Sequence, residues 1–235
     1  MTIKLFCVPY AGGSSALYNN WIKQLAPRIE CIPIELSGRG LRFIEPLYTS
    51  IEEAVDDVYT KIAAQLDSSP FAIFGHSMGA VIGFEVTHRI CQVGRIPRHL
   101  FVSGRNAPHC SITSRPIHLL SDSEFMQELV EMGGTDKTVL EHEELVDLFL
   151  PILRSDFGIS HSYKFVKKKS KLSCDISVFY GNLEQMSFED GMAWKEHSEG
   201  MCRVFKFSGN HFFIKSQEKE VLNCVRKLLT GGMAI

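Results

Sequence analysis

The sequence predicts an α/β domain built on a mostly parallel sheet, and three observations lead to this prediction. Short apolar runs rich in Val, Ile and Phe recur along the chain, segments of helical periodicity lie between them, and the length of 235 residues suits a single domain over residues 1–235. Short apolar runs are typical of strands buried on both faces of a parallel sheet. Strands that alternate with helices favour right-handed crossovers, which place helices on both faces.

The individual elements follow from local pattern. The expected strands are residues 3–8, 30–35, 71–74, 99–103, 175–180 and 203–207. A helix is expected after Ser50, because Ser50 and Glu53 have the spacing of a capping box. Its apolar positions, Ile51, Val55, Val58 and Ile62, recur with helical spacing. Residues 80–91 and 219–229 show similar helical patterns.

Residues 110–163 break the alternation and are interpreted as a helical insertion. A second capping box begins at Ser121, the pair Gly133-Gly134 ends that helix, and the segments 141–150 and 151–154 follow. Residues 145–150 are apolar on too many faces for an ordinary surface helix. The insertion either packs on the main domain or also covers a site as a lid that lines an acyl pocket.

Composition excludes several classes of protein. Apolar residues make up 45% and charged residues 22%, which is a globular composition, and a net charge of −2 argues against nucleic-acid binding. No apolar run reaches the length of a membrane span, and the N-terminus does not resemble a signal peptide, so we expect a cytoplasmic protein with no membrane partner. The seven cysteines are odd in number and show no CxxC spacing, which predicts free thiols, no metal site and no cofactor.

The strongest motif is Gly75-His76-Ser77-Met78-Gly79, a G-x-S-x-G pattern between a predicted strand and a predicted helix. In this context the pattern is the nucleophile elbow of the α/β-hydrolase fold, and Ser77 is the expected nucleophile. Glycines on either side of the serine allow the strand and helix to approach closely. His76 is expected to be a packing residue that points away from Ser77.

The base and the acid should follow Ser77 in the order acid, then histidine. His211 follows the last predicted strand and a glycine turn, so it is the expected base. Glu184 follows the fifth predicted strand and is the favoured acid, with Asp190 as the alternative. The oxyanion hole needs two backbone donors, for which we expect the amides of Met78 and Ala11.

Together these motifs resemble the type II thioesterases that accompany nonribosomal peptide and polyketide synthetases. The resemblance spans nearly the whole chain, through Trp194 and the segments 9–14, 37–42, 75–79, 151–156 and 209–213. The sequence departs from the family pattern at Glu184, where the family usually has Asp, and at Ser37, where it usually has Pro.

The resemblance implies hydrolysis of stalled or aberrant acyl groups from the phosphopantetheine thiol of acyl or peptidyl carrier proteins, through an acyl-Ser77 intermediate. It implies acyl-loaded carrier proteins as partners, and we expect the enzyme to be a monomer. Residues 164–171 form a basic run that is either a solvated linker or a docking patch for acidic carrier proteins. Arg154 and Asp156 are expected to tie the base of the insertion to the main domain by ion pairing.

Two other functions remain open at this point. The first is a cytoplasmic carboxylesterase or lipase-like hydrolase with the same catalytic chemistry. The second is a non-catalytic relative that only binds carrier proteins, which the unusual Glu184 would permit.

Overall fold

The computed structural model describes residues 1–110, 115–134, 138 and 142–231 of the chain. Within these residues, six parallel strands form one sheet in the order β2-β1-β3-β4-β5-β6. The strands are β1 (Ile3–Val8), β2 (Ile29–Pro33), β3 (Phe71–His76), β4 (His99–Ser103), β5 (Asp175–Gly181) and β6 (Cys202–Phe207). The chain order reverses at β1, and Ser77 follows β3, the strand that lies between β1 and β4.

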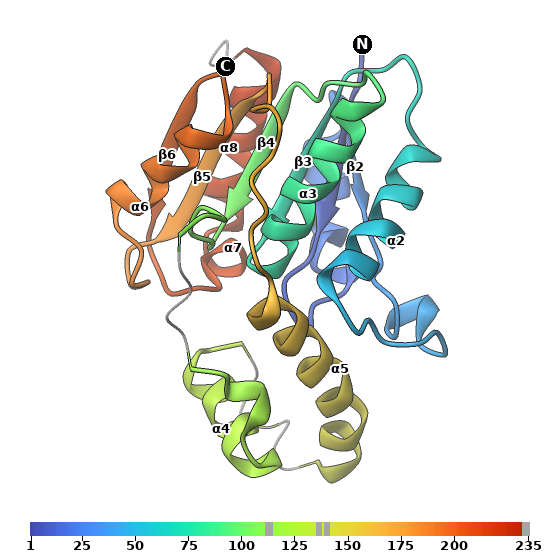
Figure 1. Cartoon of the computed structure of the whole chain (residues 1–235), viewed down its shortest axis with the longest axis vertical. Coiled ribbons are helices and arrows are strands. Elements are labelled where there is room, and N and C mark those ends of the chain that lie inside the picture. The colour runs from blue at the N-terminus through green and yellow to red at the C-terminus, as the bar shows by residue number, and fades with distance from the viewer. Residues whose placement is uncertain (111–114, 135–137, 139–141, 232–235) are drawn as a thin grey trace.

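Helices cover both faces of the sheet, as predicted. On one face lie α2 (Ile51–Ala63) and α3 (Met78–Gln92), which pack against each other; α1 (Asn19–Leu25) and α8 (Glu218–Thr230) pack together on the other (Figure 1). The shorter helices are α6 (Phe188–Met192) and α7 (Phe213–Ser216).

Alternate residues of each strand supply the two hydrophobic layers. In β1, Phe6 and Val8 belong to the layer under α2 and α3, whereas Leu5 and Cys7 belong to the layer under α1 and α8. All four side chains are completely buried, as expected for a strand covered on both faces.

The insertion lies beyond the carboxyl ends of the strands, where α4 (Asp122–Glu131) and α5 (Glu143–Ser162) form a separate lobe (Figure 1). Phe125, Met126 and Leu129 of α4 are the buried centre of this lobe, and side chains of α5 such as Val146 and Phe157 pack against them. The lobe therefore has a small hydrophobic core of its own.

Four strands have ends shifted by one or two residues from the prediction, and three larger details also differ. Residues 143–162 form one continuous helix that includes Pro151, rather than two segments divided at this proline; Glu141, the predicted start, lies outside the described residues. Ser50 caps α2 as expected, but the Glu53 carboxylate accepts from the backbone and hydroxyl of Thr49 instead of returning to Ser50. The short helix α1 was not predicted.

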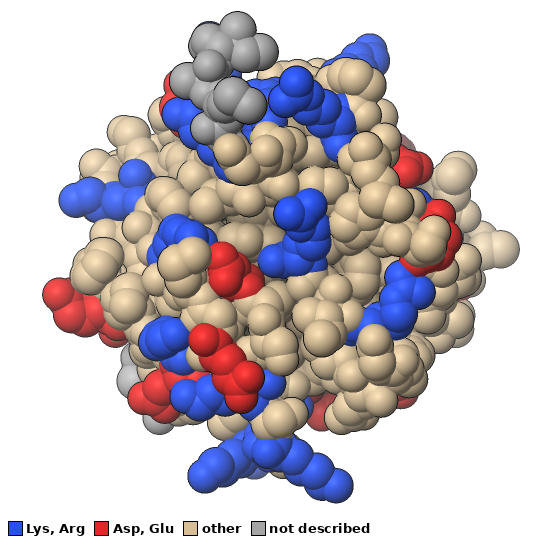
Figure 2. All heavy atoms as spheres, turned by 90° about the horizontal axis from the view of Figure 1, so that it is seen from above, with Lys and Arg blue, Asp and Glu red and all other residues tan. Residues whose placement is uncertain are grey.

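Surface charge is mixed at the end of the molecule where both termini lie. Figure 2 shows acidic and basic side chains interspersed on this face. In the described part of the chain no helix combines the length and apolar character needed to cross a bilayer.

Candidate active site

Ser77 lies at a sharp turn between β3 and α3. Its backbone has φ 54° and ψ −114°, and it is the one residue other than glycine with positive φ in the described chain. Such strain in a non-glycine residue is characteristic of a functional turn. A Cβ on Gly75 would lie 2.1 Å from the Gly79 carbonyl oxygen, so only glycine permits strand and helix to meet this closely.

His211 and Glu184 come from the loops after β6 and β5, which are neighbouring strands. Nδ1 of His211 lies 2.5 Å from Oε1 of Glu184, and the other carboxylate oxygen accepts the Gly181 amide at 2.6 Å. The Glu184 side chain is only 10% exposed. The carboxylate is therefore held from behind by its own loop and directed at the imidazole.

Asp190, the alternative acid, is engaged elsewhere. Its carboxylate accepts the Ser187 amide at 2.9 Å and completes a capping box at the start of α6. These hydrogen bonds from Ser187 lower the pKa of Asp190 below its usual value. Asp190 thus serves the helix terminus, while Glu184 contacts the histidine.

His76 is completely buried, and its Nδ1 pairs with Oγ of Ser103 at 2.8 Å. Burial, reinforced by the charges of His211 and Lys215, holds the pKa of His76 well below its ordinary value. His76 is therefore a neutral packing residue, and its ring lies against that of His211 with centroids 4.9 Å apart.

The backbone amides of Ala11, in the loop after β1, and of Met78, at the start of α3, are both free to donate a hydrogen bond to a ligand. Neither donates a hydrogen bond to any part of the chain that the structure describes. The end of β1 and the loop that follows it pack tightly on the start of α3. A Cβ on Gly79 would lie only 2.3 Å from the Val8 carbonyl oxygen, so there is no room for a side chain at this position. Ala11 and Ser77 line the same cavity. This arrangement provides two unpaired donors near the Ser77 hydroxyl.

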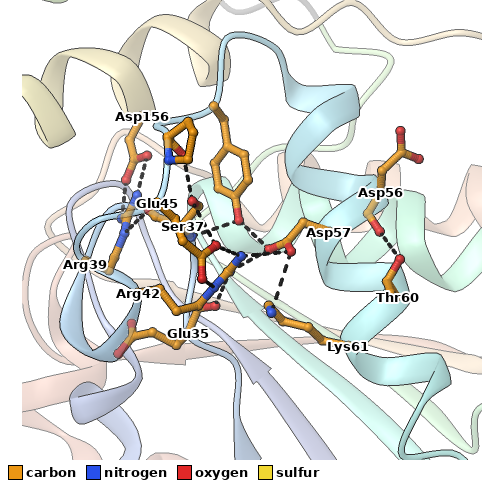
Figure 3. A network of polar contacts seen from close by, with 12 residues as sticks. Glu35, Ser37, Arg39, Arg42, Glu45, Asp56, Asp57, Thr60, Lys61 and Asp156 are labelled. Carbon is orange, nitrogen blue, oxygen red and sulfur yellow. Dashed lines mark hydrogen bonds and ion pairs between the residues drawn. The ribbon is translucent and has the colours of Figure 1, made fainter.

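A buried ion pair that sequence analysis missed holds the loop containing Ala11. The Arg39 guanidinium contacts both oxygens of Asp156 at 2.5 and 2.9 Å (Figure 3). Asp156 also accepts the Gly12 amide at 2.7 Å. Both charged side chains are at most 5% exposed. The helix α5, the turn at Arg39 and the Ala11 loop are therefore linked through one carboxylate.

Arg154 does not take part in this link, contrary to the prediction that it ties the insertion to the main domain. It pairs with Asp122 at 2.5 Å and donates to the carbonyls of His118 and Leu120, all within the insertion. Of these two residues, Asp156 is the one that reaches the main domain, through Arg39 and Gly12. Arg154 and Asp156 are two positions apart in the sequence, and this spacing gave no signal of which partner each would take.

Ser77 and His211 open onto one cavity of about 600 Å³. Tyr10 and Phe212 form part of its wall next to the β-sheet, and Phe157, Met132 and Ile117 of the insertion form the opposite wall. Apolar side chains from the main domain and from the insertion thus line the cavity together with charged groups of the insertion such as Arg115 and Glu128. The apolar part of the lining suits a small apolar group presented to Ser77.

Comparison with known proteins gives the family. A model described as the thioesterase domain matches residues 3–229. The gramicidin S biosynthesis protein GrsT of Aneurinibacillus migulanus is 37% identical over 229 residues, which cover 97% of this chain and 89% of GrsT.

Solved structures agree with this match. ClbQ from the colibactin NRPS/PKS pathway superposes with a TM-score of 0.93 at 33% identity, covering 98% of each chain. The type II thioesterase BorB from the borrelidin biosynthetic cluster superposes with a TM-score of 0.89 at 33% identity, covering 97% of this chain and 93% of BorB.

Proposed function

The chain belongs to the thioesterase domain family, and from this premise we propose that it is a type II thioesterase with Ser77, His211 and Glu184 as its catalytic triad. It hydrolyses acyl groups from the phosphopantetheine thiol of carrier proteins in nonribosomal peptide and polyketide biosynthesis. The observation that carries this proposal is the 2.5 Å contact between His211 and Glu184 at the cavity that Ser77 lines. The strained backbone of Ser77, with its positive φ, independently supports Ser77 as the nucleophile.

The first half of the reaction transfers the acyl group to the enzyme. His211 takes the proton of the Ser77 hydroxyl while the oxygen attacks the thioester carbonyl, and Glu184 stabilises the imidazolium that forms. Collapse of the tetrahedral intermediate breaks the carbon–sulfur bond, and the pantetheine thiolate leaves and takes the proton from His211. The acyl group is then an ester of Ser77.

The second half releases the acid. His211 removes a proton from water, which attacks the Ser77 ester, and the serine oxygen recovers that proton as it leaves. In both halves the oxyanion accepts hydrogen bonds from the amides of Met78 and Ala11, which have no competing acceptor in the described chain. Asp156 supports this role because it holds the neighbouring Gly12 amide.

The insertion of residues 110–163 acts as a lid in this proposal. Its side chains Phe157, Met132 and Ile117 close the acyl cavity on the side away from the sheet. Leu153 of α5 fits against Gly12, where an added Cβ would lie 2.4 Å from its side chain. Movement of α5 would therefore alter both the acyl cavity and the loop that carries Ala11.

The cellular setting completes the proposal. The seven cysteines are all free thiols, which suits the reducing cytoplasm where carrier proteins are loaded. We propose that the enzyme acts there as a monomer, because one chain supplies every residue of the site. Size-exclusion chromatography with light scattering tests the oligomeric state.

The experiment that tests the function compares thioester and oxygen-ester hydrolysis. The same short acyl group is presented on a carrier protein and as a matched oxygen ester, and kcat/KM is measured for the wild-type enzyme and for Ser77→Ala. A thioesterase prefers the carrier-bound thioester, and Ser77→Ala lowers its kcat by at least ~10³-fold.

The alternatives predict other results. A preference for the oxygen ester would identify a carboxylesterase. A wild-type enzyme that binds the loaded carrier but hydrolyses neither substrate would be a non-catalytic binder.

A further inference from the structure

Asp156 is the only acidic residue that is completely buried among the described residues of the chain. It lies on α5, within the insertion, but its hydrogen bonds in the described chain all go to the main domain. Two of them bind the Arg39 guanidinium, and the third accepts the Gly12 amide at 2.7 Å. A buried charge is costly unless it is paired and hydrogen-bonded, so a carboxylate in this position needs each of these partners.

Residues Tyr10 to Gly13 form a tight turn after β1. The Gly13 amide donates to the Tyr10 carbonyl at 2.8 Å, and Gly12 has φ 77°, as the third residue of a type II turn requires. The Tyr10 carbonyl and the Ala11 amide belong to the same planar trans peptide, so they point in opposite directions. Because the carbonyl points into the turn toward Gly13, the Ala11 amide points out of the turn, as a donor to a ligand must.

The buried ion pair holds this turn at two points. Asp156 accepts the amide of the central peptide of the turn, which joins Ala11 to Gly12. Arg39 donates to the carbonyl of Gly13, at the end of the turn, at 3.1 Å. Type I and type II turns differ by a flip of the central peptide, and such a flip would break the hydrogen bond to Asp156. The conformation and the place of the turn therefore depend on this carboxylate.

The helix α5 fixes the place of Asp156. Leu153 lies one turn before it and packs against Gly12, where an added Cβ would lie 2.4 Å from the leucine side chain. Leu153 also packs on the hydrophobic core of the insertion lobe. Phe157, the residue after Asp156, lines the cavity of Ser77. The helix that forms a wall of the acyl cavity thus also carries the side chain that holds the turn.

We propose that Asp156 is a positioning residue of the oxyanion hole, which it serves from the insertion by holding the Gly12 amide so that the Ala11 amide points at the thioester oxygen. The inference rests on the proposed function, because the Ala11 amide is an oxyanion donor only if Ser77 attacks a carbonyl carbon. Such a donor must lie about 2.7–3.1 Å from the oxyanion, so a shift of the turn by about 1 Å is enough to weaken it. Asp156 is not among the described residues that line the cavity, and it acts through the turn.

The test compares two double variants that differ in one property of residue 156. Arg39→Met/Asp156→Asn and Arg39→Met/Asp156→Leu both remove the buried ion pair and keep a side chain of similar size at this position. The asparagine variant retains an oxygen that can accept the Gly12 amide, whereas the leucine variant does not. Replacement of a buried ion pair by uncharged side chains often preserves stability, so both variants are expected to fold. Ser155→Ala is the control, because it removes a hydrogen bond from α5 to the Tyr48 carbonyl and leaves the turn untouched.

Two measurements separate positioning from a merely structural role. The first is kcat and KM for one acyl group on a carrier protein, measured well below the unfolding midpoint of each variant. The second is the Ki of butylboronic acid, whose boron accepts the Ser77 oxygen while the serine proton passes to His211. This adduct is a tetrahedral anion that imitates the reaction intermediate. An oxyanion donor acts on the intermediate rather than on the bound substrate, so its position changes kcat and this Ki but leaves KM nearly unchanged.

The expected result is a difference between the two double variants. The leucine variant should have a kcat about 10- to 100-fold lower than the asparagine variant, because complete loss of one oxyanion donor costs about 10²–10³-fold. Its Ki for butylboronic acid should be higher by a similar factor, while its KM stays close to that of the asparagine variant. Ser155→Ala should behave as wild type in both measurements.

Other outcomes overturn the inference. Equal kcat and equal Ki in the two double variants would show that the Gly12 contact has no part in catalysis. Losses in Ser155→Ala as large as those in the leucine variant would assign the effect to the seating of α5 as a whole. If either double variant does not fold, Asp156→Asn and Asp156→Ala are compared in the same way, with the same expected difference. If wild type neither hydrolyses the carrier-bound thioester nor binds butylboronic acid, the proposed function itself fails, which is a separate result.

Discussion

Replacing Glu184 by Gln tests the acid that differs from the family pattern. The substitution keeps the shape of the side chain but removes the negative charge 2.5 Å from Nδ1 of His211. Two unit charges about 4 Å apart interact by about 4 kcal/mol at an effective dielectric constant near 20. Because Glu184 and His211 are 10% and 24% exposed, solvent screening reduces this to about 3 kcal/mol. The expected loss in kcat is therefore about 100-fold.

The assay follows release of the thiol from an acylated carrier protein, with Asp190→Asn as the matched control. Asp190→Asn should stay within about threefold of wild type, since that carboxylate caps α6 and does not contact His211. The reasoning is refuted if Glu184→Gln retains near-wild-type kcat while Asp190→Asn loses most of it.

Three further predictions follow from the structure. Arg39→Met leaves the buried Asp156 carboxylate without its cation and should lower the free energy of unfolding, measured by urea titration, by about 3–5 kcal/mol. Arg89→Ala, which removes an exposed ion pair with Asp56, should lower it by less than about 1 kcal/mol. Equal losses for the two variants would contradict the role assigned to the buried pair. Gly104→Ala should lower kcat at least ~10-fold, because its Cβ would lie 3.0 Å from Cε1 of His211, while Gly94→Ala, with similar positive φ and open space, should leave kcat unchanged. Burial lowers the pKa of His99 to about 4, so the His99 side chain takes up a proton in the unfolded chain at a higher pH than in the folded protein. The free energy of unfolding should therefore decline by at most about 3 kcal/mol as the pH falls from 6.5 to 4. The His99→Gln variant should show a shallower decline over the same pH range.

The local pattern of apolar residues in the sequence was sufficient to predict the strands of the sheet. Strand β1 and strand β4 have the predicted bounds, and the ends of β2, β3, β5 and β6 differ from the prediction by at most two residues. This accuracy has a physical basis, since strands covered on both faces must be apolar throughout, which leaves a clear signal. The short helix α1 gave no such signal, because only Trp21 and Leu25 of its seven residues are buried.

The three residues of the proposed triad were predictable because each follows a particular strand along the sequence. Ser77, Glu184 and His211 each follow a parallel strand, so the topology brings their loops to one edge of the sheet. Which partner a charged side chain takes was not predictable. Arg39 and Asp156 are 117 positions apart, and nothing in local spacing pairs them.

The surroundings of the basic run of residues 164–171 also lay beyond sequence reasoning. The segment that follows α5 crosses the face of α3, which brings Lys168 to Glu85. Tertiary packing, rather than any motif, creates that proximity.

The central claim is that Ser77 carries the acyl group during turnover. The most direct measurement is rapid acid quench of the enzyme with an acylated carrier protein, followed by intact-protein and peptide mass spectrometry. The account predicts a mass increase equal to the acyl group on the peptide that contains Ser77, absent from Ser77→Ala. An acyl group found on another residue, or undiminished turnover by Ser77→Ala, would contradict it.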